Sequence, residues 1–261
     1  MKAAILFCLL CTSALADLAA GRLAWKIGDY AAALTEFLPL AKQGNAAAQV
    51  DLAVMYTKGQ GVQKDYKEAM RWFLLAAKQG NADAQFGLGY MYEKGEGVPQ
   101  DGREAVRWYR LAAEQGDTTT QYVLGGIYEF GTPGVPRDEK EALRWYRLAA
   151  EHGSADAQCE LGIKYQEGQY VPQDHREAAR WFRLAAAQGH SGAQFNLGVE
   201  YEEGRGVPQD YIQAHMWFNL AAANGNVNGI QYRDLVASKM TPDQIGEAQR
   251  RARNWRPSTR R

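Results

Sequence analysis

One motif of about 36 residues recurs five times along this 261-residue chain and constrains its fold more than any other feature. Five tryptophans set the spacing, at intervals of 36, 37, 36 and 36 residues: Trp72, Trp108, Trp145, Trp181 and Trp217. Aspartates and glycines recur in step with them: Asp65, Asp101, Asp138, Asp174 and Asp210, and Gly80, Gly116, Gly153, Gly189 and Gly225. The single extra residue lies between Gly131 and Gly134, which marks a loop. Such periods are typical of solenoids, whose units bury their apolar faces on one another.

Capping residues and glycines divide each repeat into two predicted helices. The first runs from about Ala46 to Lys58, with Asn45 as its N-cap and Gly59 at its end. Three later repeats keep a capping residue and the fifth breaks the pattern with a histidine: Asn81, Asp117, Ser154 and His190. The second helix begins at Asp65, with Glu68 at capping-box spacing. Each repeat is therefore predicted to be a helical hairpin.

Apolar residues lie on one face of each predicted helix. In the second repeat they are Ala84, Leu88, Gly89 and Tyr92, then Ala105, Trp108 and Ala112. A single hairpin leaves much of this surface uncovered until a neighbour stacks on it. Because the tryptophans and tyrosines recur at helical spacing beside alanines, we expect core packing for them rather than ligand stacking. The pattern predicts an all-α fold, a right-handed α-solenoid of helix-turn-helix repeats.

The repeated motif resembles the Sel1-like repeat, a relative of the tetratricopeptide repeat. The resemblance is carried by NADAQFGLGYMYEKGEGVPQD, from Asn81 to Asp101, and by the tryptophan and alanine positions that follow. Three residues depart from the pattern: Ala53 and Tyr170 replace glycines, and Thr120 replaces an alanine. The predicted divisions are a signal peptide over 1–16, a helical hairpin cap over 17–44, repeats over 45–80, 81–116, 117–153, 154–189 and 190–225, and capping helices with a basic tail over 226–261.

The first sixteen residues have the pattern of a secretory signal peptide. Lys2 precedes an apolar run from Ala3 to Cys11, and cleavage is predicted after Ala16. The run is shorter than the roughly 20 residues of a membrane-spanning helix, so no transmembrane segment is expected in the mature chain. We therefore expect a periplasmic or secreted protein.

Charge and side-chain chemistry exclude several function classes. The 30 basic residues balance the 30 acidic ones, which argues against nucleic-acid binding. No nucleophile stands near a base in the pattern, no histidines have the spacing of a metal site, and Cys159 replaces apolar residues of other repeats. We expect no catalytic residue, no cofactor and no metal. Some proteins similar to this family are cysteine-rich and described as binding or hydrolysing β-lactams, but their paired cysteines are absent here.

Two surfaces remain as candidate binding sites. By resemblance to tetratricopeptide arrays, the first helices line a concave groove suited to an extended peptide or a partner helix: Phe86, Tyr90, Met91, Tyr122, Ile127, Ile163, Phe195 and Val199. Core packing between repeats is the alternative for these side chains. Next to them Lys164 and Glu200 follow Met55, Met91 and Ile127, so the groove is expected to become charged along its length.

The second helices carry a series of arginines at spacings of three and four. A stripe for an anionic polysaccharide or lipid is one interpretation: Arg107, Arg110, Arg144, Arg147, Arg180 and Arg183. Glutamates three residues before Arg107, Arg144 and Arg180 favour a solvated face of ion pairs instead. The sequence thus predicts a non-catalytic interaction scaffold in the bacterial cell envelope that binds another protein. The alternatives are a β-lactam or cell-wall-processing enzyme and a binder of an anionic polymer or lipid.

Overall fold

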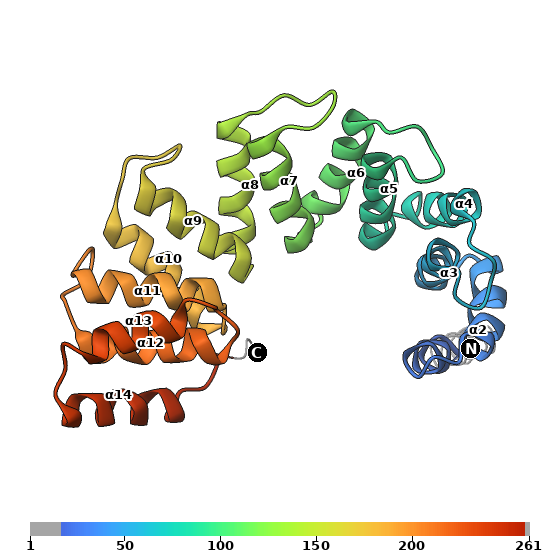
Figure 1. Ribbon diagram of the computed structural model, residues 1–261. Helices are drawn as coiled ribbons and strands as arrows, with labels where there is room; N and C mark the ends of the chain where they lie inside the picture. The colour runs from blue at the N-terminus through green and yellow to red at the C-terminus, as the bar shows by residue number, and fades with distance from the viewer. Residues whose placement is uncertain (1–16, 259–261) are drawn as a thin grey trace, which may run out of the picture. The chain divides into compact units, whose positions relative to one another are not determined.

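The computed structural model describes residues 17–258, which form helices joined by short turns (Figure 1). The predicted signal peptide lies outside the described residues. Within 17–258 the only extended pairing is an isolated bridge between Thr132 and Val135, in the loop that carries the extra residue. No helix in this part of the chain is long and apolar enough to cross a bilayer.

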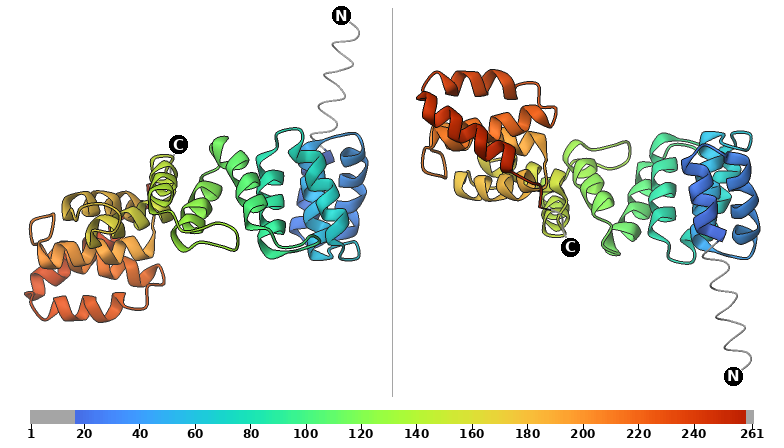
Figure 2. Two further views of the ribbon diagram at one scale, coloured as in Figure 1. Left: turned by 90° about the horizontal axis from the view of Figure 1, so that it is seen from above. Right: turned by 90° about the horizontal axis from the view of Figure 1, so that it is seen from below.

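The helices fall into two compact units. Unit 1 contains the described residues up to Thr120 together with Thr132–Pro136, and unit 2 contains Gln121–Gly131 and the residues from Arg137. Unit 1 begins with a helix over residues 17–26 and continues with α2 (Tyr30–Lys42), α3 (Ala46–Lys58), α4 (Tyr66–Ala77), α5 (Ala82–Lys94) and α6 (Gly102–Glu114). Figure 2 shows these helices stacked as successive hairpins, from blue to green.

Unit 2 continues the same alternation of first and second helices. Most of α7 (Thr118–Phe130) belongs to it, followed by α8 (Glu139–Glu151), α9 (Ala155–Glu167), α10 (His175–Ala187), α11 (Ser191–Glu203) and α12 (Tyr211–Ala223). Two further helices, α13 (Gly229–Ala237) and α14 (Pro242–Asn254), both pack on α12. The structure thus has the predicted all-α solenoid fold.

The predicted caps are present. Asn45 and Asn81 accept hydrogen bonds from the backbone three residues ahead, and each second helix starts with an aspartate that accepts from its second and third residues. His190 was expected to break the series, but its Nδ1 accepts from the Ala193 N–H at 3.0 Å. Its Nε2 lies 3.2 Å from Asp156 Oδ1. The imidazole therefore caps α11 through an unprotonated nitrogen, as a carboxylate or amide oxygen would.

A buried glutamine in each repeat connects three helices. Gln49 donates to the Ala41 carbonyl oxygen at the end of α2 and accepts from Gln79 after α4, at 3.0 and 2.9 Å. Gln158 makes the same pair of bonds, to Ala150 O and from Gln188, at 3.0 and 2.8 Å. A buried amide is stable only when its polar atoms are hydrogen-bonded, so this residue fixes how one hairpin sits on the next.

Close glycine–aromatic contacts set the spacing within hairpins. A Cβ at Gly89 would lie 2.5 Å from the Tyr109 ring, and one at Gly162 would lie 2.4 Å from Phe182. The same contact joins Gly21 to Phe37 in the first hairpin, at 2.5 Å. The tryptophans pack in the interior as expected: Trp72, Trp145, Trp181 and Trp217 are buried and Trp108 is half-buried. Small residues and rings interlock along both units.

Candidate functional site

A groove of about 550 Å³ lies in unit 1 between the first helices of neighbouring repeats. From α3 it is lined by Val50, Val54, Thr57 and Lys58, and from α5 by Asp83, Phe86, Gly87, Tyr90 and Met91. Phe73 and Tyr66 of α4 and Glu96 of the loop after α5 complete the lining. Its volume falls within the range of sites that hold small molecules or peptide side chains.

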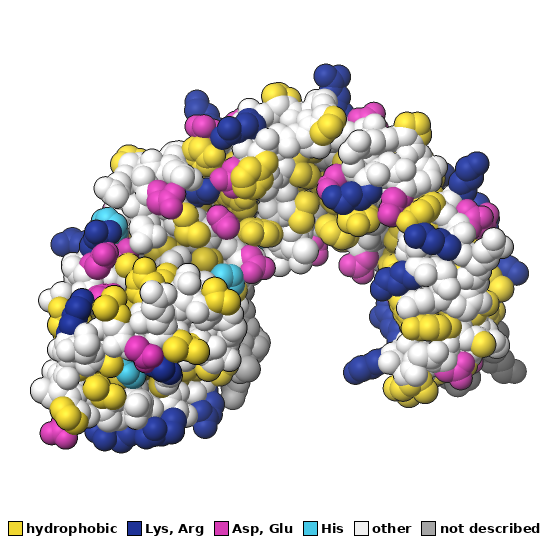
Figure 3. Space-filling model, in the orientation of Figure 1, with side chains coloured by type: hydrophobic (Ala, Val, Ile, Leu, Met, Phe, Trp, Pro, Cys, Tyr) yellow, Lys and Arg dark blue, Asp and Glu magenta, His cyan; other side chains and the backbone are white. Residues whose placement is uncertain are grey.

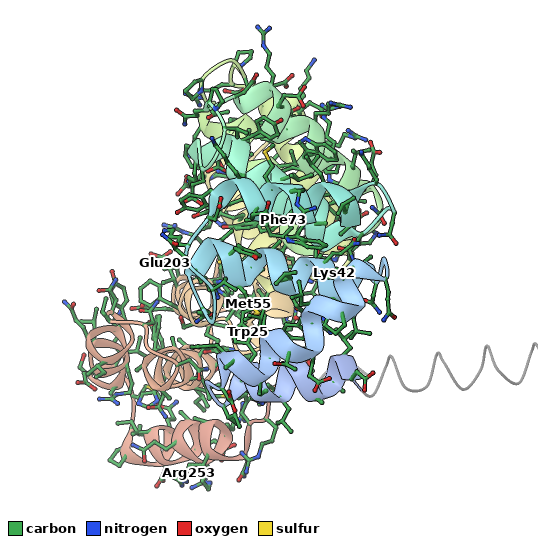
Figure 4. The ribbon with its side chains drawn as sticks, turned by 90° about the vertical axis from the view of Figure 1, so that its right-hand side faces the viewer. Trp25, Lys42, Met55, Phe73, Glu203 and Arg253 are labelled. Atoms are coloured by element: carbon green, nitrogen blue, oxygen red, sulfur yellow. The ribbon has the colours of Figure 1, made fainter. Side chains whose placement is uncertain are left out.

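The floor of the groove depends on a glycine and a displaced ring. In the first repeat Ala53 stands where later repeats have their close-approach glycine. The Phe73 ring of this repeat lies against Gly87 of the next one, where a Cβ would be only 2.7 Å from Phe73 Cε1. Met55 and Phe73 lie one above the other in the core of unit 1 (Figure 4). Because Gly87 has no Cβ, the Phe73 ring can lie against the backbone of α5 at the floor of the groove.

The walls are held by contacts outside the groove. The Phe86 ring packs on Tyr109 with centroids 5.4 Å apart, and Tyr109 donates to Glu93 at 2.8 Å. Burial, followed by the nearby Glu93 carboxylate, raises the pKa of Tyr109, so it remains a hydrogen-bond donor at physiological pH. At the loop end Tyr66 donates to Glu96 at 2.9 Å. These contacts fix the lining before any partner arrives, which lowers the entropic cost of binding.

The structure brings together three predicted groove residues in unit 1, with unequal exposure. Tyr90 is 43% exposed, Phe86 is half-buried and Met91 is only 1% exposed at the base of the groove. Charged groups flank the apolar lining, with Lys58 at the end of α3 and Asp83 at the start of α5. Figure 3 shows yellow apolar side chains between dark-blue Lys and Arg side chains over this part of unit 1.

The predicted groove residues of unit 2 lie in other surroundings. Tyr122, Ile127 and Ile163 are half-buried, and the Tyr122 ring packs on Tyr146 at 5.6 Å. Burial, followed by the charge of Glu160, raises the pKa of Tyr122 to about 12. Phe195 and Val199 belong to an apolar cluster closed by α13.

Phe195 shows how that cluster is closed. Its ring lies 4.8 Å from Tyr232 of α13 and 5.5 Å from Phe218 of α12. Phe195 and Val199 thus pack against α12 and α13 and are half-buried.

The two charged residues that were expected to line the later part of the groove are buried between repeats instead. Lys164 is 4% exposed and Glu200 fully buried, so neither side chain lines an open surface. Lys164 forms a buried ion pair with Glu129, which also accepts from Tyr146 at 2.7 Å. Buried charges are stable only when they are paired and hydrogen-bonded.

Glu200 has partners from the preceding repeat. Its Oε1 lies 3.2 Å from His175 Nδ1 and accepts from Gln166 at 3.1 Å. Its Oε2 is buried and has no hydrogen-bond partner. Burial raises the pKa of Glu200, against the opposing effect of His175.

Tyr170 adopts a glycine-like backbone beside this region. Its φ is +64°, a conformation that non-glycine residues rarely adopt and that costs on the order of 1 kcal/mol. Lys164 Nζ lies 5.3 Å from the centre of its ring. The departure from the family pattern at this loop is therefore accommodated with a cation–π contact.

The reactive side chains do not converge. Cys159 is 6% exposed in an apolar cluster, and burial, followed by Glu160 and Asp156, raises the pKa of its thiol to about 12. Such a thiol stays protonated and is a poor nucleophile at neutral pH. Over residues 17–258, no three His, Cys, Asp or Glu side chains are grouped as a metal site requires.

The arginines of the second helices are largely paired, as their spacing predicted. Arg107, Arg144 and Arg180 lie 3.1, 3.3 and 3.0 Å from the glutamates three residues before them. Their guanidinium groups also stand over the adjacent tryptophan rings, at 4.8 to 5.5 Å. Arg147 and Arg183 donate weakly to tyrosine hydroxyls at 3.4 Å, and Arg110 is half-buried. Local pairing thus reduces the field that these side chains present to an anion.

Sequence reasoning missed Val54 and Thr57 as groove residues. Val54 lies 36 residues before Tyr90, and Val50 lies 36 before Phe86. The same repeat positions that indicated the groove wall on α5 therefore mark the opposite wall on α3. The first repeat therefore carries a sequence signal for this wall.

The Sel1 repeat family model matches five segments of the chain: residues 46–81, 82–117, 119–154, 155–190 and 191–226. Each matched segment ends close to where a second helix is followed by its closing glycine. No curated protein matches the sequence.

Solved structures similar to the chain include two that share more than 30% identity with it. The first is a Sel1 repeat protein from Oxalobacter formigenes, 34% identical with a TM-score of 0.72, with 90% of this chain and 96% of that one covered. The second is a protective antigen of uropathogenic Escherichia coli that displays an SLR fold, 33% identical with a TM-score of 0.54. Here the match covers 86% of this chain and 56% of that one.

Proposed function

Since the chain belongs to the Sel1 repeat family, whose members are generally protein-interaction scaffolds, we propose that it is a non-catalytic adaptor that binds a protein segment between α3 and α5. The groove in unit 1 is the observation that carries the proposal, because it joins apolar side chains of two repeats into one open site. The segment it fits is an extended peptide or a helix edge with apolar side chains.

The rim of the groove adds selectivity for a segment with opposite charges at its two ends. Lys58 lies at the C-terminal end of α3, and Asp83 lies in the first turn of α5. A bound segment with an acidic group near Lys58 and a basic group near Asp83 meets complementary charge. Rim charges of this kind affect specificity and association rate more than final affinity.

We also propose that the protein works in the cell envelope, periplasmic or secreted. Residues 1–16 support this, with their basic start, apolar run and small residues before Asp17. Fractionation of cells that express the full chain, followed by N-terminal sequencing, tests the point. A mature protein that begins at Asp17 outside the cytoplasm is the expected result, and an uncleaved cytoplasmic chain contradicts it.

Photo-crosslinking in intact cells tests the groove. A photoreactive phenylalanine analogue at Tyr90 should capture a protein, whereas the same analogue at Leu111, an exposed apolar position on α6, should not. Adding Val54→Glu on the opposite wall should abolish capture from Tyr90 and leave the circular dichroism spectrum unchanged. Capture that persists with Val54→Glu, or that is equal from Leu111, contradicts the groove as the binding site.

Among the described residues, no observation favours either alternative, the enzyme or the binder of an anionic polysaccharide or lipid. An enzyme of β-lactam or cell-wall chemistry needs an activated nucleophile, and the Cys159 thiol is buried and protonated. Binding of an anionic polysaccharide or lipid needs unpaired cations, and three of the six candidate arginines are paired with glutamates.

A further inference from the structure

His215 of α12 occupies a repeat position that is apolar in each earlier repeat. The equivalent residues, at intervals of 36 or 37 positions, are Met70, Val106, Leu143 and Ala179. The His215 side chain is only 2% exposed, and its Nδ1 atom is buried without a hydrogen-bond partner among residues 17–258. An imidazole nitrogen that loses its water and gains no partner costs free energy, so packing alone does not explain this histidine.

The charged groups that act on His215 belong to α13. Arg233 and Asp234 both face its imidazole, and they pair with each other at 2.7 Å. On α11 and α14, which also pack on α12, Glu200 contacts His175, and Glu247 pairs with Arg250 and Arg251. Burial, followed by the charge of Arg233, lowers the pKa of His215, against the opposing effect of Asp234. The imidazole is therefore neutral at pH 7, and its protonated form meets a cation across the contact with α13.

α13 is held mainly by its packing on α12. It has nine residues, its N-cap residue Asn228 makes no side-chain capping hydrogen bond, and only Gly229 and Val236 of the helix are buried. At Gly229 the helix touches the α12 backbone, since a Cβ there would lie 2.6 Å from Ala222 N. A helix this short is marginal by itself, so a modest cost at the α12 contact is enough to release it.

α13 covers an apolar cluster that shares a repeat position with the groove of unit 1. The Tyr232 ring of α13 lies 4.8 Å from Phe195 of α11 and 5.5 Å from Phe218 of α12. Phe218 and Val236 are fully buried in this cluster. Phe195 occupies the repeat position of Phe86, which lines the groove. Release of α13 therefore uncovers a further apolar surface.

We propose that His215 acts as a pH switch, in which protonation of its imidazole releases α13 from α12 and exposes the apolar surface of Phe195 and Phe218. The neutral imidazole fills its position as the apolar side chains of the earlier repeats do. The protonated imidazole needs hydration that the closed contact does not provide, and Arg233 repels it. The charge is accommodated only when α13 moves away and water enters.

The pH range of the switch follows from the direction of the pKa shift. Because the pKa of His215 in the packed state is lower than the ordinary 6.5, the released state binds the proton more tightly than the packed state does. The packing of α13 is therefore most stable above about pH 6.5 and weakens as the pH falls below this value. Glu200 has the opposite pH dependence, so the test compares proteins that both contain it.

Hydrogen–deuterium exchange of the full chain at about pH 7.5 and about pH 5.5 tests the switch. His215→Leu is the blocking variant, because the third repeat already has leucine at this position, and His215→Ala, which matches Ala179, is a second one. The exchange rate of residues 229–237 in the wild type is divided by that in the variant at the same pH, which cancels the intrinsic pH dependence and that of Glu200. This ratio should rise about three- to tenfold on acidification. The same ratio for α9 should stay constant, because the release is local.

Two further variants separate the switch from other effects of pH. Arg233→Gln removes the repelling cation and should reduce the rise. His152→Gln introduces the residue that other repeats have at this position, as at Gln115 and Gln188, and should respond to pH like the wild type.

Three results would overturn the proposal. The first is a ratio for residues 229–237 that does not change with pH. The second is an equal rise in α9, which would mean that the unit unfolds as a whole. The third is a pH response that disappears in His152→Gln, because another histidine then carries the effect. Circular dichroism at pH 7.5 checks that each variant is folded.

Discussion

The junctions between first helices are apolar in unit 1 and charged in the last two repeats of unit 2, although both use the same repeat position. Met55 and Met91 fill it in unit 1, at 0% and 1% exposure, and Lys164 and Glu200 fill it in unit 2, at 4% and 0%. The methionines need only space, whereas the charged residues need partners from the preceding repeat. The backbone therefore tolerates a change of chemistry at a buried position when a partner changes with it.

Removing one member of the buried ion pair should give the largest effect. Lys164→Met leaves the Glu129 carboxylate buried without its cation and should destabilise the protein by about 3–5 kcal/mol in urea unfolding. Adding Glu129→Gln should recover most of the loss, because a neutral amide can still accept from Tyr146. A single Lys164→Met variant with wild-type stability would show that the pair contributes nothing to the junction.

The reverse change in unit 1 should also be severe. Met91→Lys places a cation where the neighbouring side chains are apolar, so it should destabilise by several kcal/mol, comparable with a buried unpaired charge elsewhere. Met91→Leu, which keeps the volume and apolar character, should cost less than about 1.5 kcal/mol. Equal unfolding midpoints for the two variants would mean that the junction is not closed to water.

Replacing the glycine of a glycine–aromatic contact by alanine should destabilise the protein by a similar amount in both units. Gly89→Ala and Gly162→Ala each push a Cβ to within about 2.5 Å of a ring, at Tyr109 and Phe182. Overpacking of this kind typically costs about 1–3 kcal/mol, measured by thermal or urea unfolding. Gly126→Ala, where the nearest atom to the new Cβ would be the Tyr146 hydroxyl oxygen at 3.7 Å, is the control and should change stability little. A large difference between the two units would show that more than the junction chemistry separates them.

The free energy of unfolding should depend on pH through Glu200. The methionines at the same repeat position in unit 1 do not titrate and give no such dependence. Because burial raises the pKa of Glu200 above the ordinary 4.5, the folded state binds the proton more tightly than the unfolded state. Its contribution is therefore most favourable at low pH and declines as pH rises from about 4.5 through the folded value. Glu200→Gln removes this decline, so the variant should gain stability relative to wild type as pH increases from 5 to 8. Glu203→Gln, at an exposed glutamate, should not, and an identical pH profile for both would contradict the prediction.

Surface ion pairs should give the smallest effect. Arg107→Gln in unit 1 and Arg144→Gln in unit 2 each break an exposed pair with a glutamate three residues before. Exposed pairs contribute under about 1 kcal/mol, and salt screens them further. Chemical unfolding at low and high salt should show a small loss that shrinks with salt. A loss above 2 kcal/mol would indicate that the cation–π contact with the adjacent tryptophan matters more than the ion pair.

Local chemistry made the hairpins predictable from the sequence. Asp101 caps its helix and Trp145 is buried because short-range spacing determines both, and Glu104 pairs with Arg107 for the same reason. Cys159 was correctly placed in the interior from the apolar residues at its position in other repeats.

The site was harder to predict, because a periodic position does not reveal what covers it. Phe86 and Phe195 occupy the same repeat position and are both half-buried, yet Phe86 lines a groove and the Phe195 ring packs against Tyr232. Tyr232 belongs to α13, beyond the last repeat, where the motif no longer applies. His190 was misread for a different reason: an imidazole nitrogen can accept the capping hydrogen bond when it is unprotonated.

The glutamine links between hairpins have a consequence for how such a chain can change in length. Four of the links join residues 30 positions apart, as from Gln49 to Gln79 and from Gln158 to Gln188. The link between Gln121 and His152 spans 31, because the extra loop residue lies between them. Deleting or duplicating a whole repeat brings matching donors and acceptors together again, whereas losing one residue within a helix rotates everything after it by about 100°. Single-residue changes are confined to loops such as the one after Gly131, where this chain has its extra residue. Gene variants of this protein are thus expected to differ in length by whole repeats.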